Sequence, residues 1–312
     1  MRIGEVLKNA WQRTFRYKAL WLYGLLLLGT SSGNINLNLG ERINPRAIPA
    51  NPNQLQSQLL RFIQQIGEEN LIKIGLVIMI VGIFLGLIVL FLSPIASGGL
   101  SLGALLGQEQ KPSDSVSIAG IFAAIKQDYW AIFRLNILLA LVAVLVMVVL
   151  MFPTACLTAA FGKAGVLMIP MMILTILATL VIQIISYNAR FYLVEKHSSA
   201  RASLETAWEI TKNNFKSFFG IHLLILVIMG IINLLIALPV IWTALPMIVN
   251  LDFTRHNLPL LAVVTIFSTA ISFLLSGILN PFIYHTFVQY YDRFKYAKAS
   301  NPFNETDVPL VS

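Results

Sequence analysis

The chain has 312 residues, of which 57% are hydrophobic and only 12% are charged. Soluble domains carry roughly 25% charged residues, so this chain has too few polar side chains to face water over its whole exterior. The composition excludes an ordinary soluble protein and predicts that lipid surrounds most of the chain. The net charge of +8 has three open interpretations: binding to nucleic acid, binding to anionic lipid, or the uneven loop charge of a membrane protein.

The N-terminal segment combines a basic lead with the apolar core Ala19–Gly29, a combination also found in signal peptides. Against cleavage, the lead is long and amphipathic, and Leu28-Gly29-Thr30-Ser31 is a poor cleavage site. The same pattern recurs inside the chain, where a signal peptide cannot act. We therefore predict that the segment is retained as the first span. It reaches full length only if its helix starts near Phe15 and continues past Thr30.

Five later segments are long and apolar enough to cross a bilayer, which takes about 20 helical residues. Together with the first, they predict an all-α membrane bundle of about six transmembrane helices. The segments are Leu71–Ser93, Leu135–Phe152, Ala164–Tyr187, Phe218–Trp242 and Pro259–Leu279. We expect a polar external loop over residues 30–70, with an amphipathic helix at Asn53–Gln65, and a flexible cytoplasmic tail over residues 299–312.

Lysine and arginine residues are unevenly divided between the two sides of this bundle. Of the 22, sixteen fall in the N-terminus, the second loop, the fourth loop and the C-terminal tail. Because cytoplasmic loops carry the excess of positive charge, we expect both termini to face the cytoplasm. Topology then explains the basic excess. No nucleic-acid partner is predicted, since the sequence has no basic patch interleaved with aromatic residues.

One pattern, an amphipathic helix running into an apolar segment, occurs three times. Ala10 and Trp11 of the first copy match Ala207 and Trp208 of the third at an offset of 197 residues. The middle copy, with Asp128 at the threonine position, fits less well. Such repeats indicate architecture. The copies are Ile3–Leu28, Ile118–Leu141 and Ala200–Leu226, and they predict helix–span–span units over residues 1–107, 112–197 and 198–298 of one membrane domain, residues 1–298.

The amphipathic helices are expected to lie in the headgroup plane, with tryptophan at the interface and basic residues near anionic headgroups. Two interpretations stay open. The helices either only anchor the bundle, or form a cytoplasmic collar around a lipid or partner site. The candidate lipid-contact residues are Trp11, Arg13, Arg16, Lys18, Trp208, Lys212 and Lys216.

Two returning spans contain a proline near their cytoplasmic ends. Proline removes a backbone donor and crowds the preceding turn, so we expect these helices to kink or stop there. Such breaks occur where a helix leaves the bilayer and also at the substrate sites of transporters. The candidate break residues are Pro94, Gly98, Gly99, Asn280 and Pro281. The candidate buried polar residues are Asn136, Gln183, His222, Asn233 and His285.

The sequence contains no recognisable catalytic or metal-binding motif. Its four histidines are scattered, and its single cysteine, Cys156, cannot form an internal disulfide. We therefore predict no enzyme activity, no catalytic residue, no metal site and no cofactor. Enzyme activity stays open as an alternative only in the fourth loop, where Glu195 and His197 lie near Arg190 and Arg201 in the sequence.

Several short motifs resemble those of bacterial six-span membrane proteins allied to the membrane domain of glycerophosphoryl diester phosphodiesterases. They are Leu7-x-x-Ala10-Trp11, Tyr17-Lys18-Ala19-Leu20-Trp21, Gly98-Gly99-Leu100, and Ala207-Trp208 before Asn213-Asn214-Phe215. In those phosphodiesterases the chemistry belongs to a separate catalytic domain that has no counterpart in this sequence, so the hydrolase activity does not transfer. The resemblance implies a bacterial inner-membrane location and a connection with lipid or envelope handling.

The leading hypothesis is a non-enzymatic integral inner-membrane protein, associated with lipid or envelope or acting as a membrane platform for a partner. Membrane lipids are the expected partners, and a protein partner or a second copy of the chain are further candidates. One alternative is a transporter or channel for a small or apolar substrate, and another is a membrane enzyme using cytoplasmic loop residues. A groove beneath the collar would favour lipid handling, whereas a polar cavity near the midplane would favour transport.

Reporter fusions test the predicted topology. Green fluorescent protein fused after Ser312 should fluoresce because the C-terminus is expected in the cytoplasm, whereas alkaline phosphatase at the same place should stay inactive. Alkaline phosphatase inserted in the loop over residues 30–70 should be active, because that loop is expected outside. The reverse pattern of activities would contradict this orientation.

Overall fold

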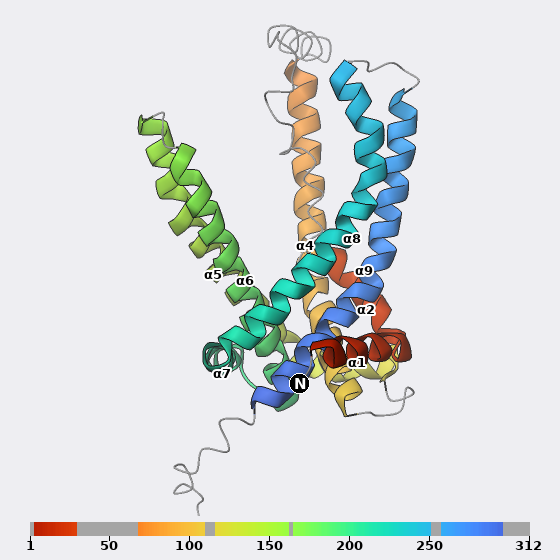
Figure 1. Ribbon diagram of the computed structural model, residues 1–312, viewed down its shortest axis with the longest axis vertical. Helices are drawn as coiled ribbons and strands as arrows, with labels where there is room; N and C mark the ends of the chain where they lie inside the picture. Colours follow the sequence, from red (N-terminus) through yellow and green to blue (C-terminus); the bar gives the residue numbers. More distant parts are fainter. Residues whose placement is uncertain (1–2, 30–67, 110–115, 162–164, 251–256, 296–312) are drawn as a thin grey trace, which may run out of the picture. The chain divides into compact units, whose positions relative to one another are not determined.

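The structure is a computed structural model and describes residues 3–29, 68–109, 116–161, 165–250 and 257–295 (Figure 1). Over these residues the chain forms eight α-helices and no strand, which confirms the all-α fold class. The helices are α1 (Ile3–Arg16), α2 (Ala19–Gly29), α4 (Glu68–Gln108), α5 (Ile118–Phe161), α6 (Gly165–Lys196), α7 (Ala200–Asn213), α8 (Phe215–Asn250) and α9 (Asn257–Lys295). The predicted loop helix Asn53–Gln65 and the tail 299–312 lie outside the described residues.

Five of the described helices, α4, α5, α6, α8 and α9, are long and apolar enough to cross a membrane. They coincide with the five predicted spans, and they support a multi-pass membrane protein. The first predicted span corresponds to α2, which is 11 residues long. The expected helix start near Phe15 is wrong, because α1 ends at Arg16 and α2 begins at Ala19. Its continuation past Thr30 lies outside the described residues, so the sixth span stays a prediction.

The chain divides into two compact units. Unit 1 comprises Met1–Leu27, Ser93–Val227 and Gly277–Ser312, and unit 2 comprises Leu28–Leu92 and Ile228–Ser276. The boundaries fall within α2, α4, α8 and α9 and do not follow the three predicted repeats, which stay a prediction. The sites described below are built from residues of unit 1.

Two short helices of unit 1, α1 and α7, lie crosswise to the long helices (Figure 1). Each buries the same three positions of the repeat, at the offset of 197 residues found in the sequence. The side chains at these positions are small or short, so they let a helix approach its neighbours closely. They are Val6, Ala10 and Thr14 in α1, and Ser203, Ala207 and Thr211 in α7.

Polar side chains fix both ends of α7. At its start, the Ser199 side-chain oxygen accepts a hydrogen bond from the backbone N–H of Ala202 at 3.3 Å, which satisfies one of the exposed donors of the first turn. At its end, the Asn214 side-chain amide donates to the Ile210 carbonyl at 3.1 Å. The chain then turns directly into α8, so α7 is a separate helix.

The middle copy of the repeat does not form the separate amphipathic helix that the sequence predicts. Its amphipathic segment is the first part of α5, which runs from Ile118 to Phe161 without interruption. Ala124, the counterpart of the buried Ala10 and Ala207, is exposed. No Gly, Pro or Asn lies between this segment and the span to end the helix there. Only the first and third copies therefore form separate crosswise helices.

The long helices do not stop at the predicted break residues. Pro94, Gly98 and Gly99 lie inside α4, and Asn280 and Pro281 lie inside α9. The expectation was a kink or a stop; these helices do not stop there, and a kink at the prolines stays a prediction. Proline is tolerated inside membrane helices when neighbouring groups satisfy the backbone that it leaves unpaired.

The surroundings of Pro281 bring α9 close to α2. Proline lacks the N–H that would bond to the carbonyl of Gly277, and this carbonyl oxygen faces the backbone of α2, where a Cβ atom at Gly24 would lie 2.6 Å from it. The Asn280 side-chain amide in turn donates to the Gly24 carbonyl at 2.9 Å. The proline therefore marks a close contact between α2 and α9.

A glycine substitution tests this contact. A Cβ atom at Gly24 would lie 2.6 Å from a backbone oxygen and 2.8 Å from Cδ of Pro281, so Gly24→Ala should lower the free energy of unfolding by about 1–3 kcal/mol. Gly220→Ala is the control, because nothing lies within 4 Å of a Cβ atom there. It should be neutral or stabilise by up to about 1 kcal/mol. Equal thermal unfolding of the two variants in detergent would contradict the contact.

Candidate functional site

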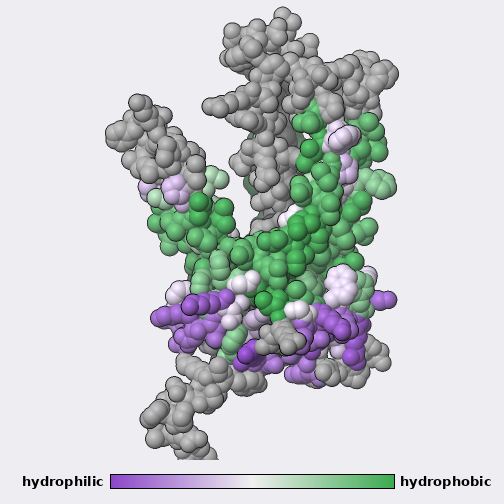
Figure 2. All heavy atoms as spheres, viewed as in Figure 1, coloured by the Kyte–Doolittle hydropathy of each residue, from purple (hydrophilic) through white to green (hydrophobic). Residues whose placement is uncertain are grey.

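The polar residues of unit 1 gather at the end that carries α1 and α7, and the apolar residues of α5 and α6 extend away from it (Figure 2). The exposed apolar side chains include Leu141 and Leu145 of α5 and Ile176 of α6. An apolar surface of this extent is typical of helices that face lipid hydrocarbon. The crosswise helices therefore lie where an apolar and a polar surface meet.

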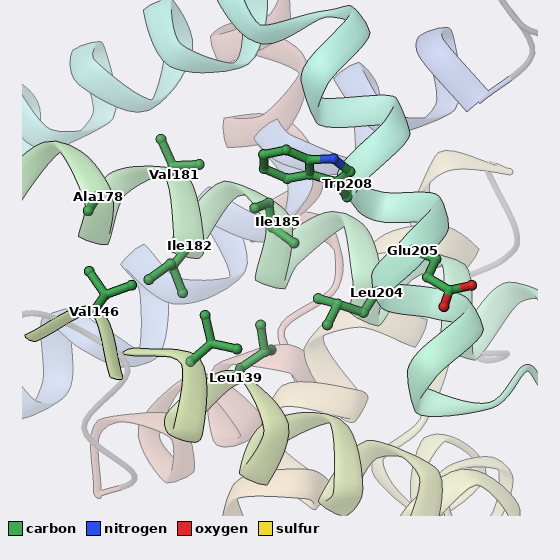
Figure 3. A pocket seen from close by; sticks show the side chains of 10 residues that line it. Leu139, Val146, Ala178, Val181, Ile182, Ile185, Leu204, Glu205 and Trp208 are labelled. Carbon is green, nitrogen blue, oxygen red and sulfur yellow. The ribbon is translucent and has the colours of Figure 1, made fainter. Parts of the chain in front are cut away.

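An apolar groove of about 520 Å³ runs between α5, α6 and α7 (Figure 3). Aliphatic side chains of α5 and α6 line it, and Leu204 and Trp208 of α7 lie at one end. The carboxylate of Glu205 points away from these side chains in Figure 3 and accepts a hydrogen bond from Arg201 at 2.8 Å. The lining residues are Leu139, Val142, Val146, Ala178, Val181, Ile182, Ile185, Leu204, Glu205 and Trp208.

The chemistry of this lining restricts what the groove can bind. Apart from Glu205 and the indole N–H of Trp208, no lining side chain carries a hydrogen-bonding group. Glu205 is occupied by Arg201, and its hydrogen bond raises the pKa of that guanidinium. The groove therefore suits a hydrocarbon chain. It has no groups to orient a polar substrate.

The two tryptophans of the repeat occupy similar surroundings. Trp11 is 48% exposed and Trp208 is 51% exposed. Trp11 packs against Phe15 and Phe282, with ring centroids 4.8 and 5.9 Å apart, and Trp208 borders the groove. Half-exposed tryptophan is typical of the membrane–water interface. Of the other candidate lipid-contact residues, Arg13 is half-buried, and those that are exposed are Arg16, Lys18, Lys212 and Lys216.

Arg190 of α6 is the centre of a buried polar network. Its side chain is 7% exposed. It donates through Nε and Nη2 to Oδ1 of Asn136 in α5, both at 3.2 Å, and through Nη1 to the Tyr284 hydroxyl in α9 at 3.3 Å. Asn136 donates onward to the hydroxyls of Ser93 and Ser97 in α4, at 3.2 and 3.4 Å. The network therefore joins α4, α5, α6 and α9 within unit 1.

The partners of Arg190 among the described residues are all neutral. An arginine keeps its proton in proteins, so the dipoles of Asn136 and Tyr284 must stabilise the charge. Removing one partner of a buried charge costs several kcal/mol. This requirement makes the network a strong constraint on how the helices of unit 1 are placed.

The fourth-loop residues considered for catalysis have separate partners. Glu195 accepts hydrogen bonds from the Tyr291 hydroxyl at 2.8 Å and from Lys295 at 3.0 Å. Nδ1 of His197 lies 2.9 Å from a carboxylate oxygen of Asp128. Neither residue is among the hydrogen-bond partners of Arg190. The side chain of Glu195 therefore contacts α9, whereas that of His197 contacts α5.

The predicted buried polar residues differ in exposure. His222 and His285 are buried, at 4% and 0% exposed, whereas Asn136, Gln183 and Asn233 are only half-buried. Nε2 of His222 lies 3.0 Å from Oε1 of Gln183. Both ring nitrogens of His285 are without a hydrogen-bond partner among the described residues. Two histidines on different helices with separate surroundings do not form a relay.

Sequence reasoning missed the role of Arg190, which it assigned to a cytoplasmic loop. In the structure α6 continues to Lys196, because the residues after Arg190 include Phe191, Leu193 and Val194, which are buried. That apolar run was the available signal. An arginine followed by more apolar residues lies within a helix and needs a partner on a neighbouring helix.

Within the described part of the chain, no three His, Cys, Asp or Glu side chains lie close enough to hold a metal ion. Comparisons with family models, curated proteins and solved structures gave no match. The function has to be inferred from the groove, the crosswise helices and the polar network themselves.

The Arg190 network predicts strong coupling between Arg190 and Asn136. Asn136→Leu removes the acceptor of two guanidinium N–H groups and should lower the free energy of unfolding by about 3 kcal/mol. Arg190→Met combined with Asn136→Leu should cost less than the sum of the single changes, because no charge is then left unpaired. Unfolding of the four proteins in detergent measures this coupling. Strictly additive effects would argue against the network.

Proposed function

We propose that the chain is a non-enzymatic integral protein of the bacterial inner membrane that binds a bilayer lipid in the groove between α5, α6 and α7. The observation that carries this proposal is the groove itself, which is lined by aliphatic side chains and bordered at one end by Trp208. It lies beneath a crosswise amphipathic helix, the arrangement expected if the collar surrounds a lipid site.

The lining and its surroundings favour a lipid as the occupant. The acyl chain would lie along α5 and α6, where burial of apolar surface supplies about 25 cal/mol per Å². The exposed side chains of Lys212 and Lys216 lie at the end of α7 and the start of α8, and lysine side chains attract anionic headgroups.

The two alternatives have weaker support. The prolines that suggested a transporter lie inside continuous helices, and the polar residues that meet from different repeats, such as Arg190 and Tyr284, bond to one another. The loop residues that suggested an enzyme, Glu195 and His197, have separate partners. The motif resemblance to the phosphodiesterase membrane domain agrees with a lipid-related role. A protein partner stays a candidate for the same surface.

Filling the groove tests the proposal. Ala178 lines the groove, and Ala178→Phe should block it and reduce the lipid retained after gentle extraction by about tenfold, equivalent to about 1.4 kcal/mol. The matched control is Ala140→Phe, on an exposed position of α5 outside the lining. It should retain lipid like the unmodified protein. Native mass spectrometry measures the bound lipid directly.

Three outcomes would count against the lipid site. The unmodified protein could carry no specific lipid in any of several detergents. The two phenylalanine variants could retain lipid equally. A co-purifying protein or a second copy of the chain, lost in Ala178→Phe, would instead identify the groove as a protein-docking surface.

A further inference from the structure

A second pocket, of about 270 Å³, lies on α1 and uses none of the groove residues. Four of its side chains recur at spacings of three and four residues, so they share one face of α1. They offer two guanidinium groups and two side-chain amides. The lining residues are Asn9, Gln12, Arg13, Arg16, Tyr17 and Gly107.

Arg13 is the half-buried arginine of this set. Burial lowers the pKa of its guanidinium, and nearby Tyr17 and Asp292 partly offset this effect. Arg13 donates to Oε1 of Gln108, a neutral acceptor. The carboxylate of Asp292 binds Lys295 at 2.8 Å, so it is already paired with another cation. Neighbouring groups therefore neutralise the positive charge of Arg13 only weakly.

Arg16 completes the cationic side of the pocket. It is exposed, and its guanidinium lies 5.5 Å from the centre of the Tyr17 ring. Among the described residues, neither Arg13 nor Arg16 has a carboxylate oxygen within salt-bridge distance. No carboxylate lines the pocket either. Arg13 and Arg16 therefore lie three residues apart on one helix without an acidic partner among the described residues. Their N–H donors match a tetrahedral oxyanion.

We propose that this pocket binds a phosphate group, the chemistry shared by phospholipid headgroups and small phosphate esters. Arg13 and Arg16 supply the charge and paired N–H donors, and Asn9 and Gln12 supply neutral donors at the rim. The crosswise placement of α1 at the polar end of unit 1 puts the pocket where headgroups are expected. The proposal does not rest on the lipid groove, since other helices form that groove.

The test measures protection against thermal unfolding of the full chain in detergent. One arm adds inorganic phosphate or glycerol 3-phosphate at constant ionic strength. The other adds dioleoyl phosphatidylglycerol, compared with dioleoylglycerol, the same lipid without phosphate. Protection by phosphatidylglycerol alone identifies a lipid headgroup as the ligand, and protection by both phosphate sources identifies the phosphate group as sufficient.

Variants that each remove one positive charge from α1 distinguish binding at a specific site from general electrostatic attraction to the helix. Arg16→Gln should weaken the protection about fivefold, and Arg13→Gln should weaken it at least as much. Lys8→Gln removes the same charge from an exposed position of α1 outside the pocket and should change it less than twofold. If Arg13→Gln fails to fold, Arg16→Gln still decides, because the described Arg16 side chain makes no hydrogen bond.

The proposal is overturned if neither phosphate source protects the chain, if dioleoylglycerol protects it equally, or if Lys8→Gln weakens protection as much as Arg16→Gln. Ala178→Phe should leave the phosphate effect unchanged, because Ala178 lies in the groove and not in this pocket. Failure of the groove and failure of the phosphate pocket are therefore distinguishable.

Discussion

Lipid cannot solvate a guanidinium, so the position of Arg190 constrains the helices that surround it in unit 1. Asn136 and Tyr284 have to stay within hydrogen-bonding distance of its side chain, which ties α5 and α9 to α6. Two residues earlier on the same helix, Asn188 donates to the Thr211 hydroxyl of α7 at 2.9 Å. One turn of α6 therefore holds both the bundle and the crosswise helix. This arrangement places α7 against α5 and α6, where the groove forms.

The same need to satisfy polar groups explains the continuity of the long helices. A proline inside a membrane helix leaves a carbonyl without its donor, and the chain must satisfy it with a neighbour. At Pro281 the carbonyl of Gly277 faces the backbone of α2 at Gly24, and the Asn280 side chain donates to the Gly24 carbonyl. Asn280 and Pro281, which suggested a break in α9, instead mark a point of close packing against α2.

Much of the fold could be predicted because its signals are local. A run of about 20 apolar residues is sufficient to identify a span, and the matched positions of Ala10 and Ala207 indicated the shared buried face of α1 and α7. The apolar run after Arg190 could have placed it within a helix, but the partners of Pro281 and Arg190 could not be predicted, since they lie far away along the chain. Of the groove, only Trp208 was singled out, because the other walls come from two separate spans whose facing sides the sequence does not reveal.

The central proposal is that a lipid chain binds between α5, α6 and α7. The most direct measurement is an electron cryo-microscopy structure of the protein in nanodiscs of bacterial lipids. A lipid chain bound in the groove should appear as a continuous tube of density along Leu139 and Ile182 that ends beside Trp208. A groove closed by its own side chains, or occupied by a neighbouring protein, would contradict it.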